Sequence, residues 1–198
     1  MSLTKVNADV LDLTDGYAFT GTVTGVGSNI LEALHMVCDG SSTTVSSGTY
    51  TSTNITAAQN TTTTTADLTG SSINYTPPSG AKTVLYEFQC GTGYLDAQAL
   101  TDFTLFLAGT EVTNARISDG HAGGLGGQMI NFKWAFKIGD GDVAASGKVA
   151  SWSSAKIIKL KVRAYHSAYE TKLHETTYWA TTTESHIIKP RISVIALS

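Results

Sequence analysis

The sequence predicts an all-β, antiparallel sandwich, and three observations carry this prediction. Apolar and polar residues alternate in most segments long enough to be strands, which is the pattern of a strand with one buried face. Turn sequences separate these segments at intervals of roughly a dozen residues, as in TPPSG, CGTG, SDGHAGGLGG and IGDGD. A helical period is nearly absent. Because each strand buries one face, antiparallel pairing in a sandwich or a barrel is expected.

The N-terminal part of the chain gives the weakest strand signals. YAFTGTVTG (17–25) and ALHMVCDG (33–40) are candidate strands. SNILEALHMV (28–37) is the best candidate for a helix, because Ser28 or Asn29 can cap it, although the segment is short. We therefore expect either a short helix or a strand at this place.

The threonine-rich segment 43–76 includes NTTTTTADLTGSS (60–72) and has few apolar side chains. Threonine suits a pleated strand because its Cβ is branched, so this segment can form strands without forming the core. We expect peripheral strands and loops that a few anchors attach to a core built by residues 83 to 197. These anchors are Val45, Tyr50, Ile55, Leu68, Ile73 and Tyr75.

The second half of the chain gives the clearest strands. TVLYEFQC (83–90), FKWAFKI (132–138) and KIIKLKVRAY (156–165) alternate without interruption. Further candidates are ALTDFTLFLAG (99–109), TEVTNARI (110–117), TTYWATTT (176–183) and RISVIALS (191–198). The inward positions of the clearest strands are Val84, Tyr86, Phe88, Cys90, Phe132, Trp134, Phe136, Ile138, Ile158, Leu160, Val162 and Ala164.

Composition limits the classes of function. The 198 residues suffice for one compact domain, and only 15% of them are charged. The formal net charge of −3 provides no basic excess, so no nucleic-acid partner is expected. Nowhere do about 18 apolar residues run together, so no membrane insertion is expected. The N-terminus has no unbroken apolar core, so no export signal is predicted. Cys38 and Cys90 lie in apolar, strand-like segments and are expected to be buried, with their pairing left open.

No motif predicts a catalytic residue, a metal or a cofactor. HETTY (174–178) differs from the zinc motif H-E-x-x-H in its last residue and in its strand-like surroundings. A weaker alternative is a metal site formed by three histidines from neighbouring strands, His166, His174 and His186. GHAGGLGG (120–127) lacks the ending of a phosphate loop, and GDGDV (139–143) is expected to be a hairpin turn. We do not expect the protein to be an enzyme. A pair of carboxylates for glycoside hydrolysis stays an alternative, because such a pair depends on geometry and not on spacing in the sequence.

Four segments carry a resemblance to a known family. NYTPPSGAKTVLYEFQC, FTLFLAGTEVTNARI, INFKWAFKIGDGD and SWSSAKIIKLKVRAYHSAYETKLHETTYW, followed by a final apolar strand, resemble the jelly-roll domains of phage and algal-virus virion proteins. Those domains are similar to the trimeric heads of the tumour necrosis factor and complement globular-head superfamily. The resemblance covers residues 17–198. The opening LTKVNADVLDLTDGYAFTGTVTG (3–25) is similar to the short leader that precedes such domains in marine phage fibre proteins, and residues 1–16 are the predicted attachment leader.

The resemblance implies a homotrimer that forms part of a virion assembled in the host cytoplasm. Tyr165, Tyr169, Tyr178 and Trp179 are its candidate trimer-interface residues, with the core of the single chain as the alternative place for these rings. The implied function is a short fibre or spike tip that contacts the host surface without catalysis. Its candidate binding residues, for a host-surface glycan, are Tyr94, His121, Gln128, Asp140 and Asp142.

Two other functions stay open at this point. A capsid decoration, or cement, protein would attach to other virion proteins through the N-terminal leader and stabilise the shell. A carbohydrate-binding or glycan-hydrolysing module is the third reading.

Overall fold

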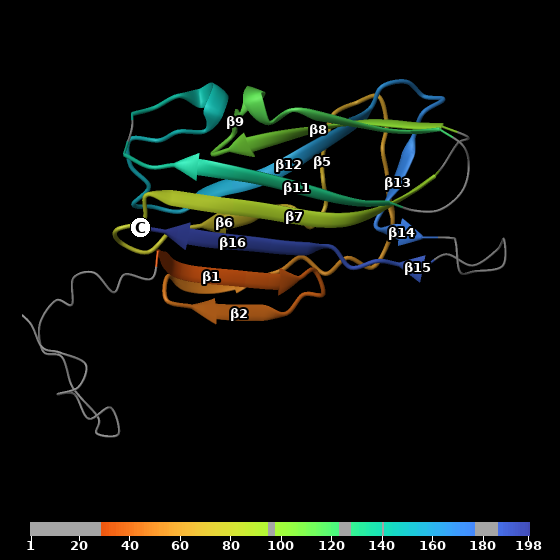
Figure 1. The fold of residues 1–198 in the computed structure, drawn as a ribbon. Coiled ribbons are helices and arrows are strands. Elements are labelled where there is room, and N and C mark those ends of the chain that lie inside the picture. The colour runs from red at the N-terminus through yellow and green to blue at the C-terminus, as the bar shows by residue number, and fades with distance from the viewer. Residues whose placement is uncertain (1–28, 95–97, 123–127, 140, 177–185) are drawn as a thin grey trace, which may run out of the picture.

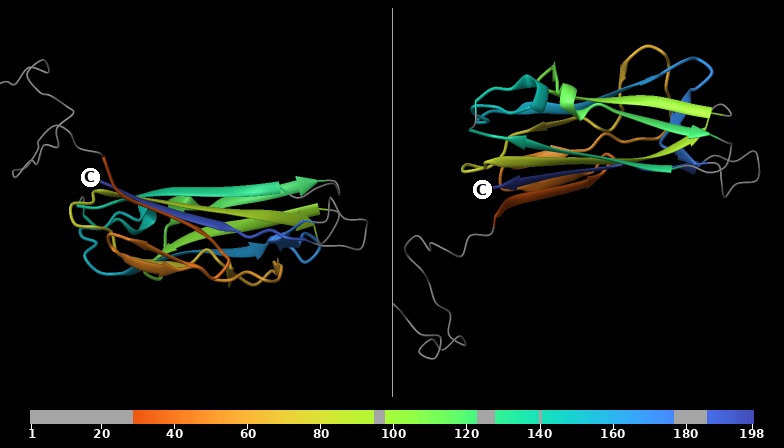
Figure 2. Two further views of the ribbon diagram at one scale, coloured as in Figure 1. Left: turned by 90° about the horizontal axis from the view of Figure 1, so that it is seen from below. Right: turned by 45° about the horizontal axis from the view of Figure 1, so that its top comes forward.

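The computed structural model describes residues 29–94, 98–122, 128–139, 141–176 and 186–198, and these residues form two antiparallel sheets packed face to face. Figure 1 shows the two layers, and Figure 2 shows them from below and tilted forward. The first sheet has the order β1 (Ile30–Val37), β16 (Arg191–Leu197), β7 (Thr83–Tyr94) and β11 (Gln128–Lys137). At its distal end, β13 (Thr171–Leu173) pairs with the last residues of β7, and β4 (Gln59–Asn60) pairs with β13. The second sheet has the order β10 (Ile117–Ala122), β8 (Gln98–Leu107) and β12 (Lys156–Ala164), and β5 (Ala66–Asp67) and β6 (Ile73–Tyr75) pair with β12.

Short elements complete the fold. β2 (Ser42–Val45) and β3 (Gly48–Thr51) form a hairpin beside β1. β9 (Thr110–Glu111) pairs with β8, and β14 (Glu175–Thr176) pairs with β15 (His186–Ile187). Two short 3₁₀ helices, η2 (Thr113–Ala115) and η3 (Ala144–Ser146), lie in the connections. Among the described residues, no helix is long and apolar enough to cross a membrane.

The strand order is that of a jelly roll. The sheets β1-β16-β7-β11 and β6-β12-β8-β10 each join strands that are far apart in the chain, and every pairing between named strands is antiparallel. Consecutive principal strands alternate between the sheets, except that β8 and β10 are neighbours in the second sheet. The predicted fold class, an all-β antiparallel sandwich of the jelly-roll type, is confirmed.

The core lies between the inner faces of the two sheets, where the predicted alternation places it. In β7, Val84, Tyr86, Phe88 and Cys90 are all at most 1% exposed. In β12, the four predicted inward residues are buried as well. In β11, Phe132 and Phe136 are buried, whereas Trp134 only packs against the edge of the core. A side chain of this size contributes roughly 1.5–3 kcal/mol when fully buried, so these strands hold the sandwich together.

Ile30–Val37 form a strand, so the helix considered for this place was wrong. β1 pairs with β16 from Ile30 opposite Leu197 to Val37 opposite Arg191, with a shift in register between Ile30 and Glu32. Its burial alternates with a period of two, with Glu32, Leu34 and Met36 pointing inward. Pairing with a central strand buries this apolar face, and tertiary packing of this kind overrides weak local propensity.

A single strand over 110–117 was also wrong. η2 interrupts this segment, and the chain leaves β9 before it joins the sheet again as β10. Val112 and Ala115 are both buried at the interruption. They are three residues apart, and a regular strand would place them on opposite faces. The predicted strand at 176–183 lies outside the described residues except for its first residue.

The threonine-rich segment forms short strands and connections, as predicted, but its buried anchors are part of the core, so a core built by residues 83 to 197 alone was wrong. Its anchors Ile55, Leu68, Ile73 and Tyr75 are at most 5% exposed, and the other two predicted anchors pack against the core. Hydroxyl groups pair across the β2–β3 hairpin, with 2.7 Å between the oxygens of Ser42 and Thr51. A few buried anchors and cross-strand hydroxyl bonds therefore hold sequence that has little apolar surface.

The two ends of the sandwich differ. At the basal end, on the left of Figure 1, β1 begins, β7 begins, and β11 and β16 end. The amide of Ser198 donates to the carbonyl of Asn29 here, at 3.0 Å. At the distal end, β7, β10 and β12 end, and β8 and β11 begin. The predicted leader, residues 1–16, lies outside the described residues.

Candidate functional site

Strand register places three predicted binding residues at the distal end. Tyr94 is the last residue of β7, and His121 pairs with Ala99 near the end of β10. Gln128 begins β11 opposite Thr92, and it is exposed. These three positions therefore belong to one end of the sandwich, where connections between strands meet.

The described residues of the predicted loop at 139–142 lie at the opposite, basal end, so they do not share one surface with the three distal positions. β11 separates the two loops, and its ten residues span about 30 Å. Asp142 is exposed and accepts a hydrogen bond from the amide of Ala150 at 2.9 Å. Asp140 lies outside the described residues. The segment is a turn but not a hairpin between neighbours, because β11 and β12 belong to different sheets.

Two of the predicted trimer-interface tyrosines form an aromatic pair at the distal end. The rings of Tyr165 and Tyr169 stack with 6.4 Å between their centroids, and the ring of His166 lies 6.0 Å from that of Tyr169. Backbone bonds from Tyr165 to Leu100 and from Leu100 to Tyr169 fix this loop to β8. Tyr165 is 67% exposed, so its ring is not part of the core of the chain. Tyr178 and Trp179 lie outside the described residues.

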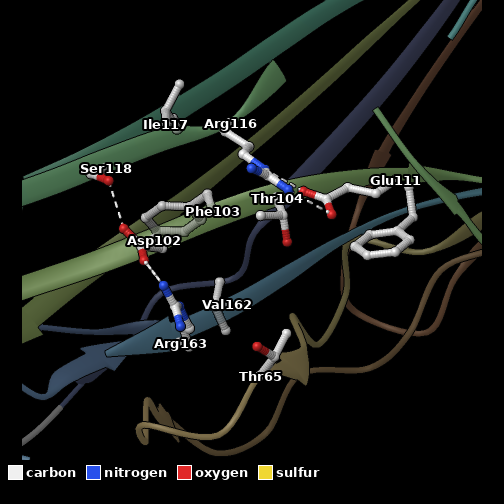
Figure 3. A pocket seen from close by; sticks show the side chains of 11 residues that line it. Thr65, Asp102, Phe103, Thr104, Glu111, Arg116, Ile117, Ser118, Val162 and Arg163 are labelled. Atoms are coloured by element: carbon white, nitrogen blue, oxygen red, sulfur yellow. Dashed lines mark hydrogen bonds and ion pairs between the residues drawn. The ribbon is translucent and has the colours of Figure 1, made fainter. Parts of the chain in front are cut away.

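A polar groove of about 520 Å³ crosses the outer face of the second sheet, and sequence reasoning missed it. We call it the sheet groove. It is shown in Figure 3, and it lies between outward side chains of β8, β9, β10 and β12. The residues that matter for its chemistry are Asp102, Phe106, Glu111, Arg116, Ser118 and Arg163.

One row of side chains crosses three strands of the groove. Ser118 on β10 and Arg163 on β12 are both paired in register with Asp102 on β8. The hydroxyl of Ser118 donates to Oδ1 of Asp102 at 2.5 Å, and Nε of Arg163 donates to Oδ2 at 3.0 Å (Figure 3). The central carboxylate is therefore held from both sides by neighbouring strands.

A second ion pair forms another wall of the groove. Nε and Nη2 of Arg116 donate to the two carboxylate oxygens of Glu111 at 2.6 and 3.1 Å (Figure 3). The hydrogen bonds from Arg116 hold the pKa of Glu111 below its ordinary value, so this carboxylate is ionised at neutral pH. Two parallel hydrogen bonds of this kind fix the planes of the guanidinium and the carboxylate relative to each other.

Apolar surface accompanies these charges. Phe106 is half-buried, and Nζ of Lys161 lies 4.6 Å from the centre of its ring. Ile117 is 41% exposed on the β10 side. The groove thus combines fixed donors and acceptors with apolar carbon, which is the usual make-up of a ligand site.

His174 does not form a metal site. It lies between β13 and β14 rather than on a helix, and it is fully buried with a positive φ of 67°. Its Nε2 lies 3.1 Å from Oγ1 of Thr69, and its Nδ1 has no hydrogen-bond partner. Within the described part of the chain, no three or more His, Cys, Asp or Glu side chains come together as metal ligands do, so the histidine convergence considered from the sequence was wrong.

The sequence holds only part of the signal for the groove. Alternation in KIIKLKVRAY places Arg163 outward, and the same pattern places Asp102 outward in ALTDFTLFLAG. Which residue of one strand faces which residue of the next depends on register, and register is set by pairing across the sheet. The sequence could have predicted that Asp102 and Arg163 face outward, but not that they lie next to each other.

No family model matches the chain, and no curated protein matches it. The chain is similar to a solved structure of infectious bursal disease virus, Gx strain, at a TM-score of 0.36 and 10% identity, over 83% of this chain and 37% of that one. It is also similar to the VP2 subviral particle of infectious bursal disease virus, at a TM-score of 0.26 and 11% identity, over 80% of this chain and 47% of that one. The chain spans less than half the length of either viral chain.

Proposed function

We propose that this chain is a non-enzymatic structural protein of a virion surface, a homotrimeric fibre or spike tip that contacts the host surface. The observation that carries the proposal is that the two ends of the sandwich differ. At the basal end, the amide of Ser198 donates to the carbonyl of Asn29 beside the first sheet. The distal end carries the exposed Tyr165 ring, which stacks on the ring of Tyr169.

A rigid sandwich with variable loops at one end is a common design for adhesion. Tyrosine is frequent in such contact surfaces because its ring is apolar and its hydroxyl is polar. The backbone positions of Tyr94, His121 and Gln128 also lie at this end.

What supports a trimer is apolar surface that the single chain leaves uncovered. On the outer face of the first sheet, Ala33, Ile195, Leu85 and Ala135 are paired in register and form one apolar row across four strands. Continuous apolar surface of this kind is typical of an interface. A second copy of the chain is the occupant we propose for it.

The oligomeric state is tested by size-exclusion chromatography with light scattering on the full chain. We expect a mass about three times the chain mass of 20.8 kDa at micromolar concentration. A species of single-chain mass under these conditions would contradict the trimer.

Location and adhesion are tested on particles of the virus that encodes the chain. We expect antibodies raised against the purified chain to label the outside of intact particles. We also expect the purified chain, added in excess, to reduce infection by occupying the host receptor. If infection is unchanged but the chain raises the temperature at which capsids open, the chain is a cement protein instead.

A further inference from the structure

We infer that the sheet groove binds a neutral saccharide. The inference rests on the proposed function, since it names the class of host-surface ligand. It concerns the outer face of β8, β10 and β12, which is a different surface from the distal loops. Its charges are balanced, its hydrogen-bonding groups are fixed, and it has apolar surface beside them.

The charges of the groove are balanced. Its lining has two carboxylates, Asp102 and Glu111, and two guanidinium groups, Arg116 and Arg163, and each carboxylate is paired with one guanidinium. A charged ligand would be attracted by one member of each pair and repelled by the other. A neutral ligand with many hydroxyl groups meets no such opposition, because a hydroxyl both donates and accepts.

The groups that face the ligand are fixed before it arrives. An arginine has five N–H donors, and Arg163 uses only Nε and Nη2 on Asp102. Arg116 likewise uses Nε and Nη2 on Glu111, so both guanidinium groups keep further donors. Cross-strand bonds hold these planes on rigid strands, which reduces the entropy lost on binding.

The groove also offers carbon surface for the C–H face of a sugar ring. Phe106 lies half-buried on β8, where Nζ of Lys161 lies over one face of its ring at 4.6 Å from the centre, and Ile117 is 41% exposed on β10. The volume of about 520 Å³ is in the range of small-molecule sites. A neutral sugar, which is polar at its edge and apolar on its face, fits both kinds of surface.

The test uses the full chain and saturation-transfer NMR. The probes are lactose, maltotriose, cellotriose and chitotriose, with sialyllactose and a sulfated disaccharide as charged counterparts. We expect saturable binding of at least one neutral probe and no preference for the charged ones. In Arg163→Ala, binding of that probe should weaken at least tenfold, because the donors and the orientation of Asp102 are both lost.

Lys133→Ala is the matched control. Lys133 forms a cross-strand ion pair with Glu87 at 3.2 Å on β11 and β7, in the first sheet. Both variants remove one exposed cation, and exposed ion pairs contribute little to stability, so both proteins should fold. Circular dichroism and thermal unfolding check the fold of each variant. We expect saccharide binding of Lys133→Ala to equal that of the unmodified chain.

Three results would overturn the inference: no neutral probe binds, a charged probe binds better, or Arg163→Ala binds as well as the unmodified chain. The proposed function fails separately. If Arg163→Ala still reduces infection as well as the unmodified chain, adhesion stands and only the groove is wrong. If the unmodified chain binds a saccharide but does not reduce infection, the saccharide site stands without the adhesion role.

Discussion

At the scale of single residues, Glu32 is a buried carboxylate that joins three elements. It is 6% exposed and accepts hydrogen bonds from the hydroxyls of Ser46, Ser47 and Tyr75 and from the amide of Ser47, at 2.5 to 2.8 Å. Burial alone would raise the pKa of Glu32, but the serine and tyrosine hydrogen bonds outweigh burial and lower it. Glu32 thus connects β1 to the turn of the β2–β3 hairpin and to β6.

We expect Glu32→Gln to lower the free energy of unfolding at pH 7 by about 1–3 kcal/mol, because charge-assisted hydrogen bonds become neutral ones and one acceptor becomes a donor. Urea unfolding measures this change. Glu87→Gln is the control, because Glu87 lies on the outer face in an exposed ion pair with Lys133, so its effect should be within about 1 kcal/mol. Since the pKa of Glu32 is lowered in the folded state, its contribution is present above about pH 4.5 and lost as pH falls further. A Glu32→Gln variant as stable as the unmodified chain would contradict this role.

His174 makes stability depend on pH in a higher range. Burial lowers its pKa to about 4, so the unfolded chain binds a proton between about pH 6.5 and 4 that the folded chain does not. Stability is therefore complete above about pH 6.5 and falls as pH decreases towards 4, by up to about 3 kcal/mol. We expect His174→Asn to remove most of this slope, because asparagine does not titrate and tolerates the positive φ of 67°.

Urea unfolding at pH 7.5 and pH 5 measures this slope. The control is His35→Asn, at an exposed position of β1, which should keep the slope of the unmodified chain. The neighbouring Glu175 is paired with Lys172 at 2.8 Å and is present in both variants. An unchanged slope in His174→Asn would show that other groups cause the acid sensitivity.

At the scale of elements, the connection between β11 and β12 depends on one glycine. Gly147 follows η3 with a positive φ of 69°, and a Cβ there would lie 2.7 Å from Cδ1 of Phe136. Phe136 is fully buried and packs edge-on against Trp152. The ring therefore has little room to move, and the connection can only close over it with a glycine at this position.

We expect Gly147→Ala to lower the free energy of unfolding by about 2–5 kcal/mol, as the sum of left-handed strain and overpacking. Gly109→Ala is the matched control, since Gly109 has a φ of 85° but no atom within 4 Å of the added Cβ. That variant should cost only the backbone strain, about 1–2 kcal/mol. Thermal unfolding compares the two. Equal costs would mean that Phe136 moves aside.

Elements also show how far the sequence predicts this fold. β7, β11 and β12 were predictable because long strands with one buried face show an uninterrupted period of two. The segment of β1 could be read as a strand or as a short helix, because the pairing with β16 that decides between them is not visible in the sequence. The interruption by η2 was not predictable, since Val112 and Ala115 keep the apolar character of a strand while the backbone turns.

At the scale of the whole molecule, pairing between distant strands creates the candidate site. Asp102 and Arg163 are 61 residues apart in the chain and become neighbours only because β8 and β12 are adjacent in the second sheet. The same topology carries loops that are close in sequence to opposite ends of the sandwich. The sequence therefore predicts the faces of the strands, whereas the assembled sheets decide which side chains meet.

The two cysteines allow opening of the whole molecule to be separated from opening of its edge. Both are free and fully buried. Burial, with Asp39 nearby, raises the pKa of Cys38 to about 11, and burial, with Asp119 nearby, raises that of Cys90 to about 12. Thiols of this kind are protonated and shielded, so they react with a disulfide reagent only after the structure opens.

We expect Cys38 to react faster than Cys90 under native conditions. Cys38 directly follows β1, which among the described strands pairs with β16 alone, whereas Cys90 lies in β7 between β16 and β11. Local opening of the edge strand exposes the first thiol, but the second requires disruption of the sheet, so its labelling rate should follow global unfolding. Labelling of Cys38→Ala and Cys90→Ala at pH 8, over a range of urea concentrations, assigns each rate to one thiol. If Cys90 reacts as fast as Cys38 in the absence of urea, β7 is not the stable centre of the sandwich.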